Sequence, residues 1–312
     1  MSDPEQRRPV RTAVVLMAYG TPGSPDEIEA YYTDIRRGRP PTPEQLAELT
    51  GRYAAIGGVS PLAARTEEQR AAVQAALDDL APDTYAVVLG LKHAHPKIEQ
   101  AVADVIADGY RDIVAAVLAP HYSELSIGEY LGRVTGAVEA SGERVTVRAV
   151  RSWARLPELV EFVADDLQHR LDVANGRTRV LFTAHSLPAR IVDAGDPYPS
   201  ELRATAEAVA ARLGLREGTD WQIAWQSAGR TPEPWLGPDV GDVIRSGTLT
   251  DVDTLIVSAV GFVSDHLEVL YDLDLEARHL AAEAGLAFDR TSCVNADPTV
   301  MAALARLIHD AP

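Results

Sequence analysis

The chain contains a single cysteine, Cys293, among its 312 residues. One cysteine excludes an intramolecular disulfide, and it excludes an all-cysteine zinc or iron–sulfur site within one chain. No apolar run approaches the roughly 18 residues of a membrane-spanning helix. Residues 1–11 are polar and lack the apolar core of a signal peptide, so we interpret them as a frayed tail. Together these features predict a cytosolic protein.

Basic residues are outnumbered in this chain. The 29 lysines and arginines are set against 46 aspartates and glutamates, which gives a net charge of −17. Nucleic acid is therefore not an expected partner, because binding to phosphates requires a basic surface. An acidic surface suits cations, whereas an anionic ligand would require a local basic cluster. Any such cluster is informative here.

Several nucleotide-binding and hydrolytic motifs are also missing. No Gly-x-Gly-x-x-Gly follows an apolar run, and the first loop leads into acidic residues that disfavour a bound phosphate. The sequence has no Gly-x-Ser-x-Gly turn and no His-Glu-x-x-His motif. These absences argue against dinucleotide binding, α/β-hydrolase chemistry and a closed zinc site.

What the sequence does contain is an alternation of apolar, β-branched runs with helical patterns. The runs predict strands at 12–19, 84–91, 112–119, 144–150, 178–184, 220–227, 253–261 and 286–292. Helices are predicted at Pro61–Leu80, Pro96–Ala107, Leu156–Leu171 and Tyr198–Leu213. The alternation predicts an α/β fold of two similar halves, each a four-stranded parallel sheet flanked by helices. We place the boundary near 172–177, which gives domains of 8–172 and 173–312.

Histidines gather at the carboxyl ends of the predicted strands, where open parallel sheets bind their ligands. The four at such ends are His93, His121, His185 and His266. This clustering points to a cleft rich in proton-transfer groups and metal ligands. His185 follows a run that should be buried, so it is a candidate base; a structural histidine bonded to a backbone carbonyl is the competing interpretation.

The stretch 261–277, GFVSDHLEVLYDLDLEA, follows a buried strand and predicts a helix. Its expected apolar stripe is Leu267, Leu270, Tyr271 and Leu275. Another face is expected to carry a row of carboxylates, with His279 among them: Asp265, Glu268, Asp272 and Glu276. Such a row can be a solvated face of an acidic protein. Because it begins where a buried strand ends, it can also conduct a divalent metal.

Within this row, Glu268 is a candidate proton acceptor or first metal contact, and a solvated helix residue is the alternative. Nothing elsewhere in the sequence requires Asp265 or His266 at a metal, so we expect both to be structural.

The strongest basic cluster is the stretch 31–39, YYTDIRRGR. Its arginines and interleaved tyrosines fit a flat aromatic anion that carries carboxylates. They also fit a helix C-terminus compensated by basic side chains and ended by Gly38. Further on, Ser60 with Pro61 after it is first interpreted as a helix N-cap.

Taken together, these motifs resemble the ferrochelatase family along nearly the whole chain. The matching stretches are LMAYGTP (16–22), YYTDIRRGR (31–39), RYAAIGGVSPL (52–62), GLKH (90–93), APHYS (119–123), TAHSLP (183–188), GDPYP (195–199), WLGPDV (235–240) and GFVSDHLEVLYDLDLEA (261–277). The resemblance implies the class II chelatase fold, with two Rossmann-like domains and a porphyrin cleft between them. It implies insertion of Fe²⁺, as a substrate, into a porphyrin in haem biosynthesis. No organic cofactor is implied, and the four cysteines of relatives with an iron–sulfur cluster are absent.

The resemblance also implies roles for individual residues. The metal-insertion pair corresponds to His185 and Glu268, with Tyr19 on the opposite porphyrin face, where it can contact the iron. The outer metal path corresponds to Asp272 and Glu276, with His93 nearby. The positions expected to contact the porphyrin or its propionates are Arg36, Arg52, Tyr53, Ser60 and Tyr130.

The AYGTP and RRGR forms resemble the enzymes of Gram-positive-type bacteria that act on coproporphyrin III, a tetracarboxylate, and give coproheme. The arginine cluster favours this more anionic substrate on charge. Three alternatives remain: a protoporphyrin IX ferrochelatase, another class II chelatase that inserts cobalt or nickel, and a non-catalytic haem-binding delivery protein. We expect a monomer that makes transient contact with another enzyme of the haem pathway.

Overall fold

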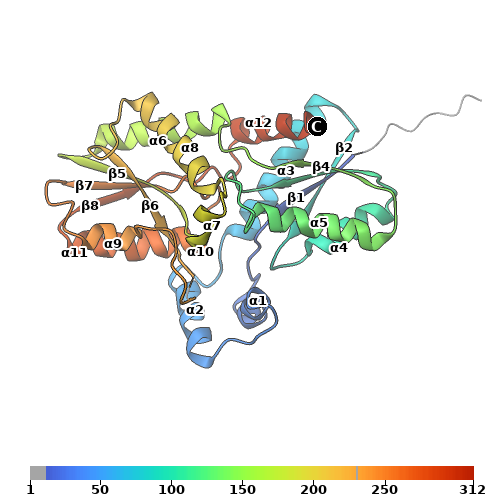
Figure 1. Cartoon of the computed structure of the whole chain (residues 1–312), viewed down its shortest axis with the longest axis horizontal. Helices are drawn as coiled ribbons and strands as arrows, with labels where there is room; N and C mark the ends of the chain where they lie inside the picture. Colours follow the sequence, from blue (N-terminus) through green and yellow to red (C-terminus); the bar gives the residue numbers. More distant parts are fainter. Residues whose placement is uncertain (1–11, 230) are drawn as a thin grey trace, which may run out of the picture.

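Two four-stranded parallel sheets form the frame of the molecule (Figure 1). The computed structural model describes residues 12–229 and 231–312, so the predicted tail lies outside it. The first sheet has the order β2-β1-β3-β4, from β1 (Thr12–Ala18), β2 (Tyr85–Leu91), β3 (Asp112–Val117) and β4 (Thr146–Val150). The second has the order β6-β5-β7-β8, from β5 (Thr178–His185), β6 (Trp221–Gln226), β7 (Thr254–Ser258) and β8 (Ala287–Arg290). The predicted α/β fold and its eight strands are confirmed.

Helices cover both faces of each sheet (Figure 1). Over one face lie α3 (Leu62–Leu80), α6 (Pro157–Val173), α8 (Tyr198–Leu213) and α12 (Pro298–His309). Over the other lie α4 (Ile98–Ala107), α5 (Ile127–Ser141), α9 (Val240–Arg245) and α11 (Arg278–Glu283). Because both faces are covered, the central strands are buried continuously, as the seven residues of β1 and the five of β7 are. This burial explains why their sequences are unbroken apolar runs.

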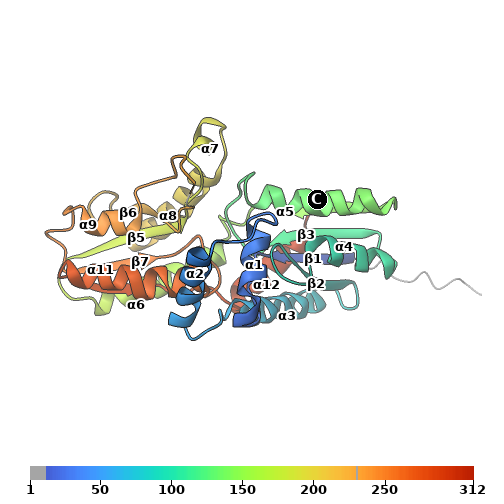
Figure 2. The same ribbon diagram turned by 90° about the horizontal axis from the view of Figure 1, so that it is seen from below.

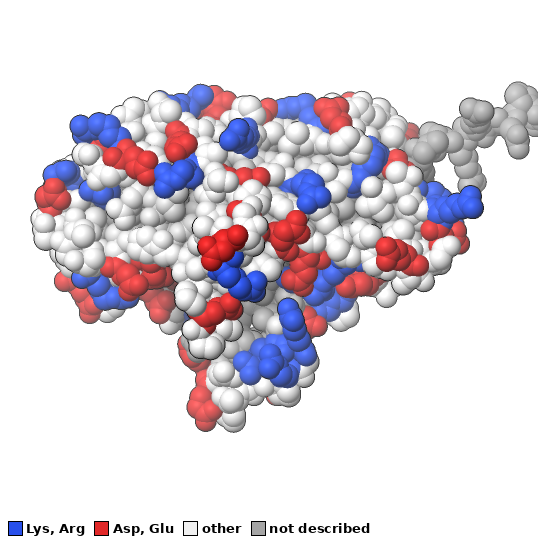
Figure 3. Space-filling view, viewed as in Figure 1, with Lys and Arg blue, Asp and Glu red and all other residues white. Residues whose placement is uncertain are grey.

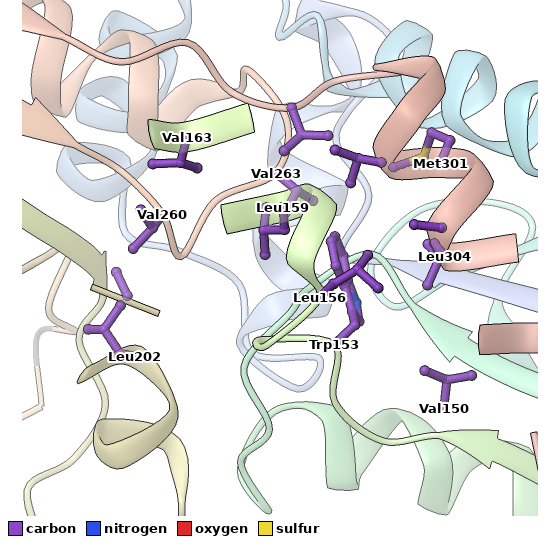
Figure 4. Packing of buried hydrophobic residues seen from close by; sticks show 14 of the residues in the cluster. Val150, Trp153, Leu156, Leu159, Val163, Leu202, Val260, Val263, Met301 and Leu304 are labelled. Atoms are coloured by element: carbon purple, nitrogen blue, oxygen red, sulfur yellow. The ribbon is translucent and has the colours of Figure 1, made fainter. Parts of the chain in front are cut away.

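The two halves share one hydrophobic core. Figure 4 shows Trp153, Leu156 and Leu159 close to Met301 and Leu304 of α12. The helix α12 follows the second sheet in the chain but packs against α3 of the first, whereas α6 packs against α8 and β7. Both helices therefore cross the boundary that we predict at 172–173, and that division stays a prediction.

A smaller lobe projects from the frame between the two sheets (Figures 1 and 2). It is formed by α1 (Ile28–Ile35) and α2 (Pro43–Ala55). A capping box between Thr42 and Gln45 starts α2. The buried side chains of Ile28 and Tyr53 pack against Leu267, which begins α10 (Leu267–Leu270). The lobe is thereby seated against the segment that carries the predicted carboxylate row. Among the described residues, no helix has both the length and the apolar character needed to cross a membrane.

Candidate metal-insertion site

His185 and Glu268 lie side by side at one edge of the second sheet. His185 is the last residue of β5, and Glu268 lies in α10 beyond the loop that follows β7. Strands β5 and β7 are parallel neighbours, so their carboxyl ends meet at the same edge. The Nε2 atom of His185 is 3.6 Å from Oε1 of Glu268, and the side chains are 36% and 34% exposed. The Nδ1–H group of His185 donates to the carbonyl of Ser186 at 2.5 Å, so Nε2 is the nitrogen that faces Glu268.

His185 and Glu268 each shift the pKa of the other so that the charged form is favoured. Burial alone would raise the pKa of Glu268, but the imidazoles of His185 and His266 lower it well below its usual range. Burial would likewise lower the pKa of His185, but the charge of Glu268 raises it. The pair therefore combines an ionised carboxylate with a strengthened base, which suits removal of protons from a bound ligand.

A second imidazole, that of His266, lies beside Glu268, and the structural role that we expect for His266 stays a prediction. Its Nε2 atom lies 3.6 Å from Oε2 of Glu268, on the side opposite His185. Its Nδ1–H group donates to the carbonyl of Ser264 at 3.0 Å. His266 precedes α10 with an extended backbone (φ −157°, ψ −178°), so a helical projection misplaces it. Asp265 turns away from the row and contacts Arg290.

The apolar stripe predicted for 261–277 is also wrong in part. Leu275 is 42% exposed, and the residues buried against the second sheet are Val269, Leu273, Ala277 and Ala281. The cause is a π-helix over Asp272–Ala277, whose wider turn changes the phase of the side chains. Leu267 and Tyr271 pack instead against the lobe. His279, predicted within the row, is exposed and contacts Glu283.

Asp272 and Glu276 continue the carboxylate row from Glu268. Asp272 accepts a hydrogen bond from Ser227 at 2.5 Å and forms an ion pair with Arg52. Burial raises the pKa of Asp272 to about 6, although Arg52 and Ser227 act against this; the charges of Glu268 and Glu276 raise it further. The three carboxylates are therefore close enough to influence one another. Glu276 is exposed at the outer end.

The first half contributes Tyr19, which directly follows β1 and is 42% exposed. Its ring lies against that of His93, with the centroids 4.6 Å apart and the planes tilted at 56°. Although Tyr19 is 42% exposed, partial desolvation of its phenol, followed by the charge of Glu268, raises the pKa of Tyr19, so the phenol stays protonated. Tyr19 therefore presents a neutral hydroxyl group just beyond the carboxyl end of β1.

His93 lies beside Tyr19, with its Nδ1 atom 2.7 Å from a carboxylate oxygen of Asp34. Its place on the outer metal path stays a prediction, because both of these contacts are in the first half. His121 lies outside the site: it is buried, and its Nε2 atom is 2.9 Å from Oγ1 of Thr205. Burial lowers the pKa of His121 to about 3, so the ring is neutral.

The predicted porphyrin contacts surround Tyr19 and the lobe. A pocket of about 420 Å³ beside Tyr19 is lined in part by Arg37, Lys92 and Arg133. Figure 3 shows basic side chains gathered on the lobe. The Nε–H group of Arg36 donates to the carbonyl of Arg39 at 3.2 Å, which fits the helix C-terminus that we also considered.

The other residues predicted to contact the porphyrin are buried or partly buried. Tyr130 is buried in α5 under Lys92, whose Nζ atom is 5.3 Å from the ring centroid. Tyr53 is 2% exposed within the lobe, and Ser60 accepts a hydrogen bond from the backbone N–H of Leu62 at 3.2 Å. Arg52 is engaged with Asp272. Contacts of these residues with a porphyrin stay predictions. Across the described parts of the chain, no three His, Cys, Asp or Glu side chains converge as a metal cage would require.

Two parallel four-stranded sheets, with ligand-binding groups at their carboxyl edges, place this protein among the class II chelatase folds. A solved structure of the same fold is the sirohydrochlorin chelatase SirB from Bacillus subtilis subspecies spizizenii in complex with cobalt. It matches with a TM-score of 0.58 and 10% sequence identity over 96% of this chain and 94% of that chain. SirB from Bacillus subtilis with Fe³⁺ gives the same TM-score at 12% identity.

The family model described as Ferrochelatase matches residues 11–311, and the chain belongs to the ferrochelatase family. A ferrochelatase of Herpetosiphon aurantiacus is 43% identical over 92% of this chain and 95% of its own length. A coproporphyrin III ferrochelatase of Geobacillus thermodenitrificans is 43% identical over 95% of this chain and 94% of its own. That of Halalkalibacterium halodurans is 43% identical over 96% of both chains. The family expected from the motifs is confirmed.

Proposed function

We propose that this protein is a cytoplasmic, monomeric ferrochelatase that inserts Fe²⁺ into coproporphyrin III to give coproheme in haem biosynthesis. One observation carries the proposal: the His185–Glu268 pair lies at the carboxyl edge of the second sheet, at the inner end of a row of carboxylates. The names of the relatives from Geobacillus thermodenitrificans and Halalkalibacterium halodurans support the choice of porphyrin. The basic side chains on the lobe fit its four carboxylates.

In the proposed reaction, one Fe²⁺ replaces two protons at the centre of the porphyrin ring. The free porphyrin carries two pyrrole N–H protons, and insertion of one Fe²⁺ releases both. The Nε2 atom of His185 is placed to accept the first proton, because Nδ1 is engaged with the carbonyl of Ser186. The side chain of His185 is 36% exposed, so it releases this proton to water and then accepts the second. Glu268 stabilises the resulting imidazolium and offers an oxygen to the entering metal.

The other site residues deliver the metal and hold the ring. Asp272 and Glu276 attract Fe²⁺ and replace part of its water shell with carboxylate oxygens. Tyr19 keeps a protonated phenol on the far face of the macrocycle. No organic cofactor and no iron–sulfur cluster take part in this scheme, since the metal is itself a substrate.

Time-resolved absorbance of coproporphyrin III and Fe²⁺ under anaerobic conditions tests the proposal. We expect many equivalents of metalloporphyrin per protein molecule, against a control with His185→Ala. A spectral change that stops at one equivalent would contradict turnover and favour a delivery protein. Faster insertion of Co²⁺ or Ni²⁺ into another tetrapyrrole would contradict the choice of metal.

A further inference from the structure

The side chain of Gln69 joins the two halves of the molecule at the loop that leads into the metal site. Gln69 lies in α3 of the first half and is 0% exposed. Its Nε2 group donates to the carbonyl of Asn295 at 2.9 Å and to that of Val263 at 3.4 Å. Its Oε1 atom accepts a hydrogen bond from the Ser264 hydroxyl at 3.0 Å. All three partners belong to the second half.

These hydrogen bonds continue to the imidazole beside Glu268. The carbonyl of Ser264 accepts the Nδ1–H group of His266, which leaves Nε2 of His266 facing Glu268. Asn295 holds the residue between them: its Oδ1 atom accepts from the backbone N–H of Asp265 at 3.0 Å, and its Nδ2 group donates to the Asp265 carboxylate at 2.8 Å. Each residue from Ser264 to His266 is therefore held, and Gln69 is the link to the first half.

The helix that carries Gln69, α3, follows the lobe directly in the chain. It begins at Leu62, just after the loop that contains Ser60. At about 1.5 Å per residue, Gln69 lies about 10 Å along the helix from Leu62. At the far end of the link, Val263 lies in the core shared by both halves, near Leu159 in Figure 4. The position of residues 263–266 relative to helix α3 is therefore held by the hydrogen bonds of Gln69 and by the packing of Val263 in the shared core.

We propose that Gln69 is a positioning residue for metal insertion. Its amide orients the backbone of 263–266 so that the ring of His266 holds Glu268 toward His185. This inference rests on the proposed function, because it assigns Gln69 to the same metal-insertion pair. It requires no contact between Gln69 and the substrate, so loss of the amide should affect turnover and leave porphyrin binding intact.

The variant that tests this is Gln69→Met, which keeps the length of the side chain and removes its hydrogen bonds. Gln74→Met is the matched control, since Gln74 lies on the same helix but its hydrogen bonds among the described residues stay within its own half, with the carboxylate of Asp78 and the backbone of Tyr85 and Val87. We expect kcat to fall at least tenfold in Gln69→Met with the KM for porphyrin unchanged, and kcat to stay within twofold in Gln74→Met. Equal kcat values for the two variants, measured below both melting temperatures, would overturn the inference.

A readout that needs no turnover separates this inference from the proposed function. The imidazole nitrogen resonances of His266 report its tautomer in the ligand-free protein, and those of exposed His279 serve as the internal reference. Gln69→Met should shift the resonances of His266 alone, even if the protein proved inactive toward coproporphyrin. Should Gln69→Met not fold, Ser264→Ala removes only the hydroxyl contact and should give a smaller shift and a two- to fivefold loss of kcat. Unchanged His266 resonances in the folded variant would overturn the inference.

Discussion

The guanidinium of Arg52 forms an ion pair with the carboxylate of Asp272, and this contact joins the lobe to the metal-insertion segment of the second half. Arg52 also lies over the ring of Tyr271, 4.6 Å from its centroid. A residue expected to hold the porphyrin and a residue expected to attract the metal are thus each other's partners. The guanidinium opposes the effect of burial on Asp272, so it helps to keep that carboxylate ionised.

The KM for Fe²⁺ should depend on pH through Asp272. Its pKa is raised to about 6, so the carboxylate takes up a proton and loses its attraction for the metal as pH falls through that value. Arg52→Ala removes a charge that lowers this pKa, so the rise in KM should begin at a higher pH. Steady-state kinetics between about pH 5.5 and pH 8 measure this. The matched control is Arg65→Ala, which breaks an exposed ion pair with Glu68; superimposable profiles for Arg52→Ala and the wild type would contradict the assignment.

His185→Ala should lower kcat by about 10²–10⁴, the range that a positioned base contributes. Binding of the porphyrin should persist, because the predicted ring contacts lie in the first half and the lobe. Anaerobic insertion assays measure the first effect, and quenching of porphyrin fluorescence measures the second. The control is His279→Ala, which removes an exposed imidazole of the same half. Insertion at a near-normal rate in His185→Ala would refute the assigned role.

Glu268→Gln should move the pH profile of the residual activity toward acid. The negative charge of Glu268 raises the pKa of His185, while burial acts in the opposite direction. Without that charge the pKa of His185 falls, so its neutral, proton-accepting form persists to lower pH. The measurement is kcat against pH for the variant and the wild type. A shift of the acid limb to higher pH would show that another group controls it.

Replacement of Arg36 and Arg37 by alanine should raise the KM for coproporphyrin more than the KM for a porphyrin with fewer carboxylates. Each exposed arginine–carboxylate contact is worth about 0.2–1 kcal/mol, so losing two predicts an increase of about 2- to 30-fold. The control is Arg111→Ala, which removes an exposed arginine paired with Glu143. Equal increases for both porphyrins would argue against substrate recognition by the lobe.

Most of the frame could be predicted because it depends on local patterns. Strands such as β1 and β7 are buried on both faces and are therefore apolar without interruption. The adjacency of His185 and Glu268 also follows from general principles, since the carboxyl ends of neighbouring parallel strands share one edge.

The features that could not be predicted from the sequence depend on local backbone geometry or on contacts between residues far apart in the chain. The π-helix at Asp272–Ala277 has no local signature, so the stripe through Leu275 is given the wrong phase. The contact of His266 with Glu268 is not anticipated, because His266 lies in extended backbone just before a helix. The contact of Gln69 with Ser264 spans 195 positions, and no periodicity encodes it.

The most direct test of the central claim is the ratio of kcat/KM for coproporphyrin III to that for protoporphyrin IX, with Fe²⁺ under anaerobic conditions. Two additional carboxylates, each gaining about 0.7 kcal/mol from basic side chains, predict a ratio of about ten. A ratio well above one, lost when Arg36 and Arg37 are replaced by alanine, is the predicted result. A ratio of one or below would contradict coproporphyrin III as the substrate.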